Sequence, residues 1–377
     1  MNIAKSKILQ LTEKYATSSH INFIVRRIFF FFIIIGTMAM LFSFTSMPHK
    51  RLADEREDSV AQNEDSVVSV IAWFNKNDTM TYWINESTWD IRKGDTIKTA
   101  GINTKIMITV TDSTKKGYDM EYSFLDFKTD SVKDSWKQNL LNEALNKYKE
   151  AMKGTTIKFR TDIYGKIIKY DNLNEIKKQS KQLFMETIKE MSIIDSLAVA
   201  GIDIKTLLKD VDADRLVQGY IEELELMFKH HGTTYNIVSI TNHSDATEDD
   251  YETDSYVSVS ENNETYDYRI VVDVNNYIPK DDIKAIIEGV ASAYLDEDKF
   301  NEVKEDMDEN FDKQVSDDLL YNTYLSIDYF YDGWPKEIIK QEKRVIGKIG
   351  KLSQKYITWD CRNVRPLLSN KSWLIGL

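Results

Sequence analysis

Residues 118–127 read YDMEYSFLDF, and the alternation within this stretch decides the fold class. Met120, Tyr122 and Phe124 alternate with the polar Glu121 and Ser123, which predicts a strand with one apolar face and one polar face. Strands of this kind form antiparallel sheets that bury one side and leave the other in water. The stretch therefore predicts an antiparallel sheet with its core on one face.

Further strand-like stretches lie on both sides of this one. They are rich in β-branched and aromatic residues and are separated by turns containing Asn, Asp or Gly. The stretches are SVVSVIAWFN (66–75), TMTYWIN (79–85), KIMITVTD (105–112), the hairpin TIKFRTDIYGKIIKY (156–170), TTYNIVSITN (233–242), DSYVSVSE (254–261), TYDYRIVVDVNN (265–276), LLYNTYLSIDYFYDG (319–333), KEIIKQEKRVIG (336–347) and KYITWD (355–360).

Helical periodicity occupies the segments between these strands. We expect helices over 131–152, 172–194, 204–231, 280–295 and 299–313, where apolar residues recur every three or four positions. Gly154 and Gly232 are expected to end the first and third of these helices. The predicted fold is α+β, with curved antiparallel sheet packed by long amphipathic helices.

Two hairpins suggest an internal repeat. The stretches TIKFRTDIYGKIIKY and SIDYFYDGWPKEIIK each join a strand to an Ile-Ile strand through an Asp/Gly turn. One hypothesis is a duplicated unit with halves at 66–195 and 204–360. The alternative is that unrelated antiparallel hairpins share this composition, and the few shared letters leave both open.

The N-terminal region predicts export. Residues 28–44, IFFFFIIIGTMAMLFSF, contain no charge between Ile28 and Phe44, and Arg26 and Arg27 precede them at the end of a basic segment, 1–27. A basic flank before an apolar run directs the following chain across a membrane. We expect residues 28–47 to be an uncleaved anchor, because the basic lead is long and no A-x-A-like site follows. A cleaved signal is the alternative.

The predicted body differs in charge from the anchor. We expect a polar stalk over 48–65, an exported domain over 66–360 and a tail over 361–377. Beyond residue 50 the chain has 43 basic and 60 acidic residues, a net charge of −17. This balance argues against a nucleic-acid partner, which requires clustered Lys and Arg. Repulsion from anionic headgroups favours a body that projects from the bilayer.

No catalytic, metal-binding or cofactor-binding residues are predicted. His230 and His231 are interpreted as a helix C-terminus that complements the helix dipole. The acidic runs near 210 and 306 lack the Gly and Glu that a calcium loop of the EF-hand type needs. Glu223 and its acidic neighbours are interpreted as the solvated face of a helix. Cys361 is the single cysteine and has no accompanying nucleophile signature.

An apolar cleft between sheet and helices is the remaining candidate site. A curved sheet packed by amphipathic helices can enclose a cleft for a lipid or another hydrophobic ligand. The alternative is a filled core. The candidate wall residues are Trp73, Tyr82, Trp83, Phe124, Tyr268 and Tyr329.

The layout resembles a group of uncharacterised envelope proteins. An export signal, paired strands and FRTDIYGKI running into NLNEI and a helix are similar to cell-envelope proteins of Bacteroidetes-type bacteria. Their half-barrel domains are similar in outline to periplasmic lipoprotein carriers, and the resemblance implies such a domain over most of 66–360. Many relatives carry a lipidated cysteine after the signal, and this chain has none there. The resemblance assigns no functional residues.

The sequence thus predicts a non-enzymatic envelope protein tethered to the lipid bilayer through residues 28–44, or secreted to the periplasm if the signal is cleaved. Its expected partner is a hydrophobic ligand or lipid in the cleft. One alternative is a structural or partner-recognition module that recruits another envelope protein through exposed strand edges. A hydrolase without a recognisable motif is the third.

Overall fold

The computed structural model describes residues 67–130, 147, 149–190, 213–247, 250–294, 297–315 and 317–365. The predicted anchor, with Arg26, Arg27, Ile28 and Phe44, lies outside these residues, as does most of the expected helix 131–152. Among the residues described, no helix is both long enough and apolar enough to span a membrane.

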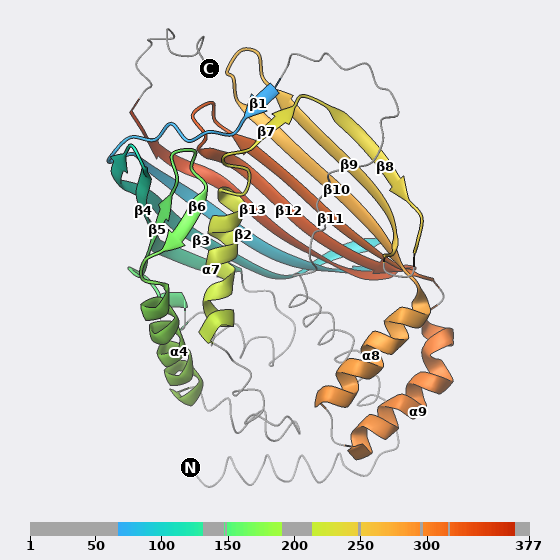
Figure 1. Cartoon of the computed structure of the whole chain (residues 1–377). Helices are drawn as coiled ribbons and strands as arrows, with labels where there is room; N and C mark the ends of the chain where they lie inside the picture. The colour runs from blue at the N-terminus through green and yellow to red at the C-terminus, as the bar shows by residue number, and fades with distance from the viewer. Residues whose placement is uncertain are drawn as a thin grey trace. The chain divides into compact units, whose positions relative to one another are not determined.

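One curved antiparallel sheet dominates the described chain, which confirms the predicted sheet (Figure 1). Its eleven strands follow the order β6-β5-β4-β3-β2-β13-β12-β11-β10-β9-β8, and β1 pairs separately with β7. The strands are β1 (Val67–Ser69), β2 (Thr79–Arg92), β3 (Asp95–Thr114), β4 (Gly117–Asp130), β5 (Thr156–Thr161), β6 (Ile167–Tyr170), β7 (Thr234–Asn236), β8 (Ser239–Ser244), β9 (Glu252–Glu261), β10 (Tyr268–Ile278), β11 (Leu319–Tyr329), β12 (Pro335–Ile346) and β13 (Ile349–Asn363).

Four helices are described. They are α4 (Leu173–Glu190), α7 (Ala213–Met227), α8 (Lys280–Tyr294) and α9 (Glu297–Gln314), with 15 to 18 residues each. Of these, α8 and α9 lie where the sequence predicts helices over 280–295 and 299–313. The chain divides into two units, of which one contains 278–319 and the other contains the rest of the described residues. In the second unit, α4 and α7 contribute buried residues to the same core as the sheet.

The register of the strands explains this core. Met80, Ile108, Tyr122 and Ile157 stand opposite one another on β2, β3, β4 and β5, and none of them is exposed. Their polar neighbours point to the other face, as the alternation in 118–127 predicts. The buried row joins Leu224, Met227 and other apolar residues of α7 in one cluster.

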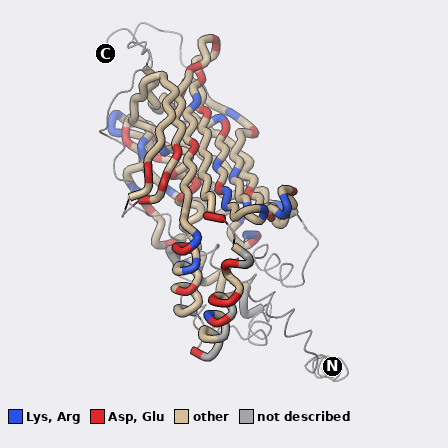
Figure 2. Tube along the Cα trace, turned by 90° about the vertical axis from the view of Figure 1, so that its right-hand side faces the viewer, with Lys and Arg blue, Asp and Glu red and all other residues tan. Residues whose placement is uncertain are grey.

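The helical unit at 278–319 is held by a buried seam and a ladder of ion pairs. Lys280 pairs with Asp312 at 3.0 Å and Lys284 with Asp308 at 2.7 Å, so α8 and α9 run antiparallel. Ile287 and Met307 are among the residues buried in the seam. The unit contains five Lys and fourteen Asp or Glu, a net charge of −9. Charged residues follow both helices in Figure 2.

The expected strand over 66–75 is wrong beyond Ser69. Val70, Ala72 and Phe74 are buried alternately, as in a strand, but the backbone of this segment bonds to loops. The amide of Val70 donates to the Thr233 carbonyl, that of Ala72 to Tyr164 and that of Trp73 to Asp332. Apolar alternation therefore marks burial here without a sheet partner.

A hairpin between residues 86 and 104 was not predicted. β2 and β3 continue as a paired ladder to Arg92 and Asp95, around a turn in which Gly94 has φ 91°. The segment reads DTIKTAGINT after the turn, and its polar residues hide the period-two pattern. In this hairpin β2 also pairs with β13 and β3 also pairs with β4. These neighbouring strands stabilise the extended backbone, which the local sequence does not indicate.

The two similar hairpins do not occupy equivalent places. Residues 156–170 form β5 and β6 at one edge of the sheet, whereas 326–340 belong to β11 and β12 in its interior. The order of strands runs outward from β2 to β6 in the first half and inward from β8 to β13 in the second. The topology therefore contradicts the duplication and favours the alternative of shared hairpin composition.

Antiparallel pairing places a set of turns at one end of the sheet. We call this the Trp73 end; it comprises segment 70–74 and turns 75–78, 115–116, 162–166, 262–267 and 330–334. The turns at 93–94, 245–251 and 347–348 lie at the opposite end.

A buried histidine ties the Trp73 end together. His231 is 2% exposed and its Nε2 donates to the Gly333 carbonyl at 3.0 Å. A Cβ on Gly165 would lie 2.4 Å from the His231 Cδ2, so the 162–166 turn packs directly on the imidazole. Burial lowers the pKa of His231 to about 4, and the pKa of the neighbouring His230 also falls to about 4.

These lowered pKa values predict acid sensitivity. As pH falls from 6.5 toward 4, the unfolded chain binds a proton at His231 and the folded chain does not, so stability declines by about 3 kcal/mol for this residue. We expect His231→Phe to remove roughly these 3 kcal/mol from the loss of stability at low pH. The separate contribution of His230 should remain. The measurement is urea unfolding at pH 7 and pH 4.5.

The control is His243→Gln. His243 is exposed, and hydrogen bonds to Asp254 and Asp245 raise its pKa, so its loss leaves the decline at low pH in place. Equal pH dependence in wild type and His231→Phe would contradict the assignment.

Candidate functional site

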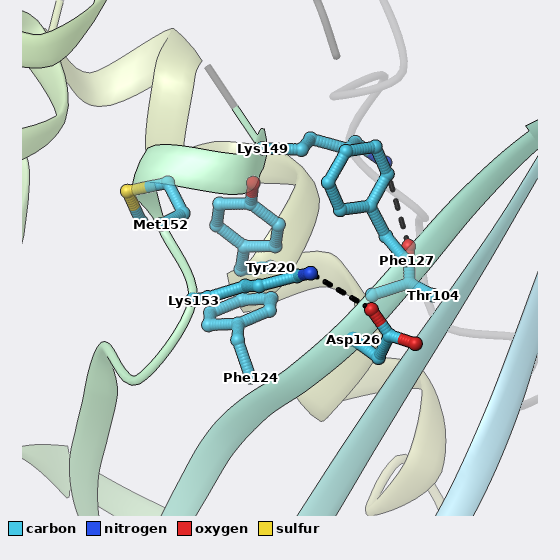
Figure 3. A pocket seen from close by; sticks show the side chains of 8 residues that line it. All are labelled: Thr104, Phe124, Asp126, Phe127, Lys149, Met152, Lys153 and Tyr220. Atoms are coloured by element: carbon cyan, nitrogen blue, oxygen red, sulfur yellow. Dashed lines mark hydrogen bonds and ion pairs between the residues drawn. The ribbon is translucent and has the colours of Figure 1, made fainter. Parts of the chain in front are cut away.

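A small hollow lies between the sheet and two helical segments (Figure 3). Strands β3 and β4 supply one wall, α7 supplies another and the helical turn around 149–153 closes it. It has about 250 Å³ of space unoccupied by atoms, part of which is open to solvent. The lining residues are Thr104, Phe124, Asp126, Phe127, Lys149, Met152, Lys153 and Tyr220.

The inner part of the hollow is apolar. Phe124, Met152 and Tyr220 are all at least nine-tenths buried, and the rings of Phe124 and Tyr220 meet edge to face at 4.5 Å. The amide of Gly154 donates to the Phe124 carbonyl at 3.1 Å, which fixes the helical turn against β4. Gly154 has φ 79° and ends this helical segment, as the sequence predicts.

Two lysines stand at the outer part of the hollow. Lys153 pairs with Asp126 and Glu150 at 2.9 Å each, and its Nζ lies 5.6 Å from the centre of the Phe127 ring. The Lys149 side chain is 12% exposed, and its Nζ lies 3.5 Å from Thr104 Oγ1 and 3.7 Å from Glu86 Oε2. Lys149 is therefore well buried but held only by long contacts.

A buried charge chain adjoins the hollow and ties α7 to the sheet. Lys355 of β13 lies 3.1 Å from Glu223 of α7 and 3.1 Å from Glu86 of β2. Tyr122 of β4 donates a hydrogen bond to the other oxygen of Glu223. Burial alone lowers the pKa of Lys355, but the two carboxylates outweigh it and raise that pKa above its usual value.

Glu86 completes the chain of alternating charges. Burial acts to raise its pKa, but the ammonium groups of Lys355 and Lys149 outweigh burial and hold the pKa below its usual value. The charges alternate as Glu223, Lys355, Glu86 and Lys149, from the buried Glu223 to Glu86, whose side chain is 37% exposed, and the set is neutral. Such pairing is what makes buried charge tolerable in a core.

The role of Glu223 corrects the sequence interpretation. It is 5% exposed and faces the sheet, whereas it was assigned to a solvated helix face. The position indicates this: Glu223 follows Tyr220 by three residues and precedes Met227 by four, which is the spacing of the buried stripe. Its partner Lys355 is 132 residues away in sequence, so the sequence gives no sign of the pair.

The six predicted cleft residues lie in three different surroundings. Tyr82, Tyr268 and Tyr329 are core residues, and Phe124 alone lines the hollow. Trp83 lies on the opposite face of the sheet, with Lys105 and Lys128 at 5.2 and 5.8 Å from its ring centre. Trp73 is exposed at the Trp73 end. The structure therefore does not bring the six side chains to one cleft.

The histidines occupy separate places. His230 Nδ1 lies 2.7 Å from the Tyr235 hydroxyl, and His243 contacts Asp254 and Asp245 at the surface. Because burial keeps His230 and His231 neutral, the interpretation that they complement a helix dipole as cations is wrong. Within the described ranges, no group of three His, Cys, Asp or Glu side chains is arranged to hold a metal ion.

The charge chain predicts an asymmetric effect of two neighbouring glutamates. Glu223→Gln leaves the buried Lys355 with a single carboxylate partner, so we expect the free energy of unfolding to fall by about 2 kcal/mol. Glu222→Gln, on the exposed side of the same turn, should change it by less than about 0.5 kcal/mol. Urea unfolding at pH 7 measures both, and equal losses would contradict the assigned network.

Comparison with known proteins yields little. No protein-family model matches the chain, and no curated protein matches it. Four chains of solved structures do match. One belongs to a structure described as "Lipid-protein interactions in lipovitellin", with 8% sequence identity and a TM-score of 0.39 over 79% of this chain. The chain spans about a quarter of that protein's length, and a likeness this weak supports no conclusion about function.

Proposed function

We propose that this chain is a membrane-tethered protein of the cell envelope that binds an amphiphile, an apolar chain with an anionic headgroup, in the hollow beside α7. The observation that carries the proposal is the hollow itself. It combines an apolar interior with a buried lysine that has only distant partners. These two features match the two ends of such a ligand.

The apolar end of the ligand would contact Phe124, Met152 and Tyr220. Aromatic and thioether side chains favour an alkyl chain because they offer apolar surface that adapts in shape. The enclosed part of the hollow is about 10 Å³, room for about one water molecule and far below the roughly 300–1,000 Å³ of typical ligand pockets. An alkyl chain would therefore enter only when α7 or the 149–153 turn moves outward.

The anionic headgroup would pair with Lys149. Lys355 already has two carboxylates at 3.1 Å, and Lys153 has two at 2.9 Å. Lys149 has no contact shorter than 3.5 Å among those described, so a carboxylate or phosphate could approach it more closely. A charge-assisted hydrogen bond to a lysine is typically 2.7–2.9 Å long and stronger than the contact it would replace.

The tether remains part of the proposal. Residues 28–44, with Arg26 and Arg27 before them, would cross the bilayer and leave the acidic body on the exported side. The resemblance to envelope proteins with half-barrel domains supports the same placement.

A matched pair of lysine variants tests the headgroup assignment. We expect Lys149→Gln to weaken binding of dodecanoate about tenfold, corresponding to the loss of one charge-assisted hydrogen bond. Lys147→Gln, which removes an exposed lysine two residues away, should leave affinity unchanged. Native mass spectrometry of the full-length protein released from detergent measures the affinity of both variants for dodecanoate. The uncharged 1-dodecanol is the control ligand, and its affinity should not depend on Lys149. No dodecanoate binding to the wild type would contradict the proposed function.

A second candidate is partner recognition through β8, which one observation favours. The six residues of β8 are exposed, pair with β9 without a bulge and include neither Lys nor Pro. The other edge strand, β6, has four residues, a bulge in its pairing and Lys169. Short length, a bulge or a lysine normally protects the edge strand of a native sheet from pairing with another chain. β8 has none of these three features except its modest length, so it is the edge open to an added strand.

The edge proposal predicts a position-specific effect of proline. The Val259 amide donates to the Val238 carbonyl, so alternation along the pair directs the Thr241 amide away from β9. A photo-crosslinker at Ser239 should capture a partner in native membranes, and Thr241→Pro should abolish the adduct without lowering stability. Asn242→Pro removes a ladder bond and serves as the destabilised control. An adduct that persists in Thr241→Pro would contradict strand addition.

A further inference from the structure

Exposed aromatic side chains gather at the Trp73 end. In the part of the chain that the structure describes, six Trp or Tyr side chains are classed as exposed: Trp73, Tyr164, Tyr256, Tyr266, Tyr331 and Trp359. Four of the six lie in loops of the Trp73 end, with exposed fractions between 42% and 53%. Ile163 is a fifth large apolar residue there, at 44%. Aromatic residues are normally used to fill a core, so this concentration requires an explanation.

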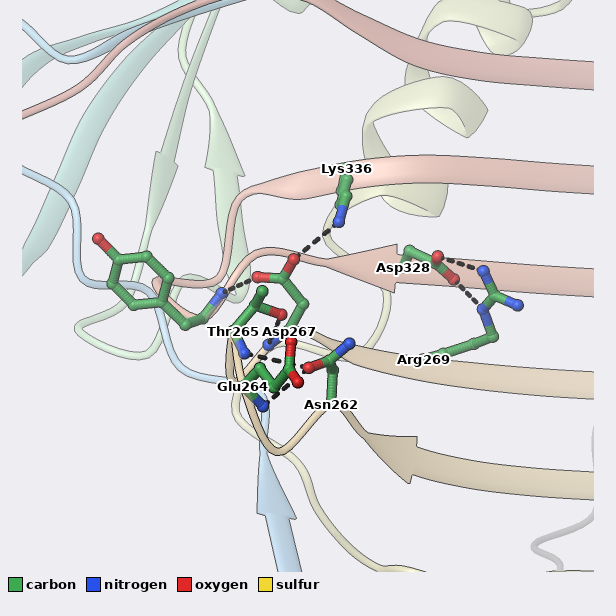
Figure 4. A network of polar contacts seen from close by, with 8 residues as sticks. Asn262, Glu264, Thr265, Asp267, Arg269, Asp328 and Lys336 are labelled. Atoms are coloured by element: carbon green, nitrogen blue, oxygen red, sulfur yellow. Dashed lines mark hydrogen bonds and ion pairs between the residues drawn. The ribbon is translucent and has the colours of Figure 1, made fainter.

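Hydrogen bonds join these loops into one surface. The Ala72 amide donates to the Tyr164 carbonyl at 2.9 Å, and the Trp73 amide donates to the Asp332 carbonyl at 3.0 Å. The Tyr331 amide donates to the Asp267 carboxylate at 3.2 Å, which connects the 330–334 turn to the 262–267 turn (Figure 4). The four aromatic side chains therefore belong to loops that are fixed side by side.

The backbone at Tyr266 is strained in a way that presents its ring. Tyr266 has φ 59°, a left-handed conformation that a bulky residue rarely adopts. Asn262 holds the turn in this shape, because its side chain accepts hydrogen bonds from the Glu264 and Thr265 amides (Figure 4). The Asn262 carbonyl also accepts a hydrogen bond from the Tyr266 amide at 2.7 Å. Strain of this kind persists at sites where it serves a function.

The exposed charges among these loops are mainly basic. Lys76, Lys115, Lys116 and Lys166 are exposed, and Glu264 is the one exposed acid in the loops that define the Trp73 end. Asp78 and Asp332 are buried, Asp162 is half-buried, and Asp267 is paired with Lys336 at 2.7 Å. Lys76 is itself paired with Asp112 of β3 at 3.2 Å. The loops of the Trp73 end thus carry four exposed positive charges and one exposed negative charge, in a body with a net charge of −17.

The chain also enters the sheet unit at this end. β1 begins at Val67, and Val70 bonds to Thr233 beside the same loops. Twenty-two residues, 45–66, separate Val67 from the apolar run 28–44. A chain of 22 residues spans at most roughly 80 Å even when fully extended, so the Trp73 end is tethered within that distance of the run.

We propose that the Trp73 end rests on the bilayer surface, with Trp73, Tyr164, Tyr266 and Tyr331 in the headgroup layer and the four lysines against lipid phosphates. This inference rests on the membrane tether of the proposed function. Trp and Tyr are enriched at membrane–water interfaces because one part of each side chain is apolar and another can hydrogen-bond. Lysine near an anionic surface adds a favourable electrostatic contribution.

Charge favours a lipid surface over an acidic or basic protein as the occupant. The body as a whole is repelled by anionic lipid, and the exposed lysines of the Trp73 end reverse that repulsion locally. At the opposite end the turn 245–251 is acidic, but the turns 93–94 and 347–348 carry the exposed Lys93 and Lys348. The orientation therefore rests on the exposed aromatic residues, which gather at the Trp73 end.

Spin labels at the two ends of the sheet test the orientation. Tyr164→Cys and Ile349→Cys, each in a Cys361→Ser background, place a nitroxide at exposed positions of 48% and 59% at opposite ends. The full-length chain is reconstituted in vesicles of phosphatidylethanolamine and phosphatidylglycerol, and collision rates with oxygen and with a nickel chelate are measured. Lys116→Cys supplies an independent label at the Trp73 end if Tyr164→Cys does not fold.

The expected result is a shift of the collision ratio toward oxygen at positions 164 and 116, with position 349 as accessible to the nickel chelate as a label in water. Equal ratios at both ends in protein that resists carbonate extraction would overturn this inference and leave the tether standing. Loss of both collision rates at 164 would also overturn it, because it indicates contact with a second protein copy. Release of the protein by carbonate would refute the tether and this inference together.

Discussion

The link between Glu223 and Lys355 sets the position of α7 above the sheet, and the hollow exists only because α7 stands there. An ammonium group in a core is costly unless carboxylates surround it, so Lys355 requires both Glu223 and Glu86. Leu224 and Met227 are fully buried and pack α7 against the sheet. Hydrogen bonds from Lys355 and Tyr122 to the two oxygens of one carboxylate add a dependence on direction that apolar contacts lack.

The sequence predicts the sheet well where apolar alternation is strong and poorly where burial has another cause. Met120, Tyr122 and Phe124 indicate both the strand and its buried face. Val70, Ala72 and Phe74 show the same alternation, but their backbone bonds to three loops that are distant in sequence. A pattern of side chains reports which residues are buried, and it does not report which backbone groups they pair with.

The candidate site is less accessible to sequence reasoning because its charges come from distant segments. Lys149, Glu86, Glu223 and Lys355 lie on four different elements, and each looks like a surface residue in its own segment. Tyr82, Tyr268 and Tyr329 were predicted as cleft walls because large aromatic residues can line a cleft as well as fill a core. Their exposed fractions, all below 6%, show that they fill the core, but the sequence alone does not distinguish the two uses.

The two proposed sites constrain each other through their spacing along β4. Phe124 follows Gly117, which begins β4 at the Trp73 end, by seven residues, a distance of about 20 Å at the rise of a strand. If the Trp73 end rests on headgroups, the hollow lies well outside the bilayer. An amphiphile would have to leave the membrane completely before Lys149 could bind its headgroup, so its whole apolar chain would need cover. The enclosed part of the hollow has room for about one water molecule, which means that movement of α7 must accompany binding. The strength of the Glu223–Lys355 link would then govern how readily the site opens as well as where α7 stands.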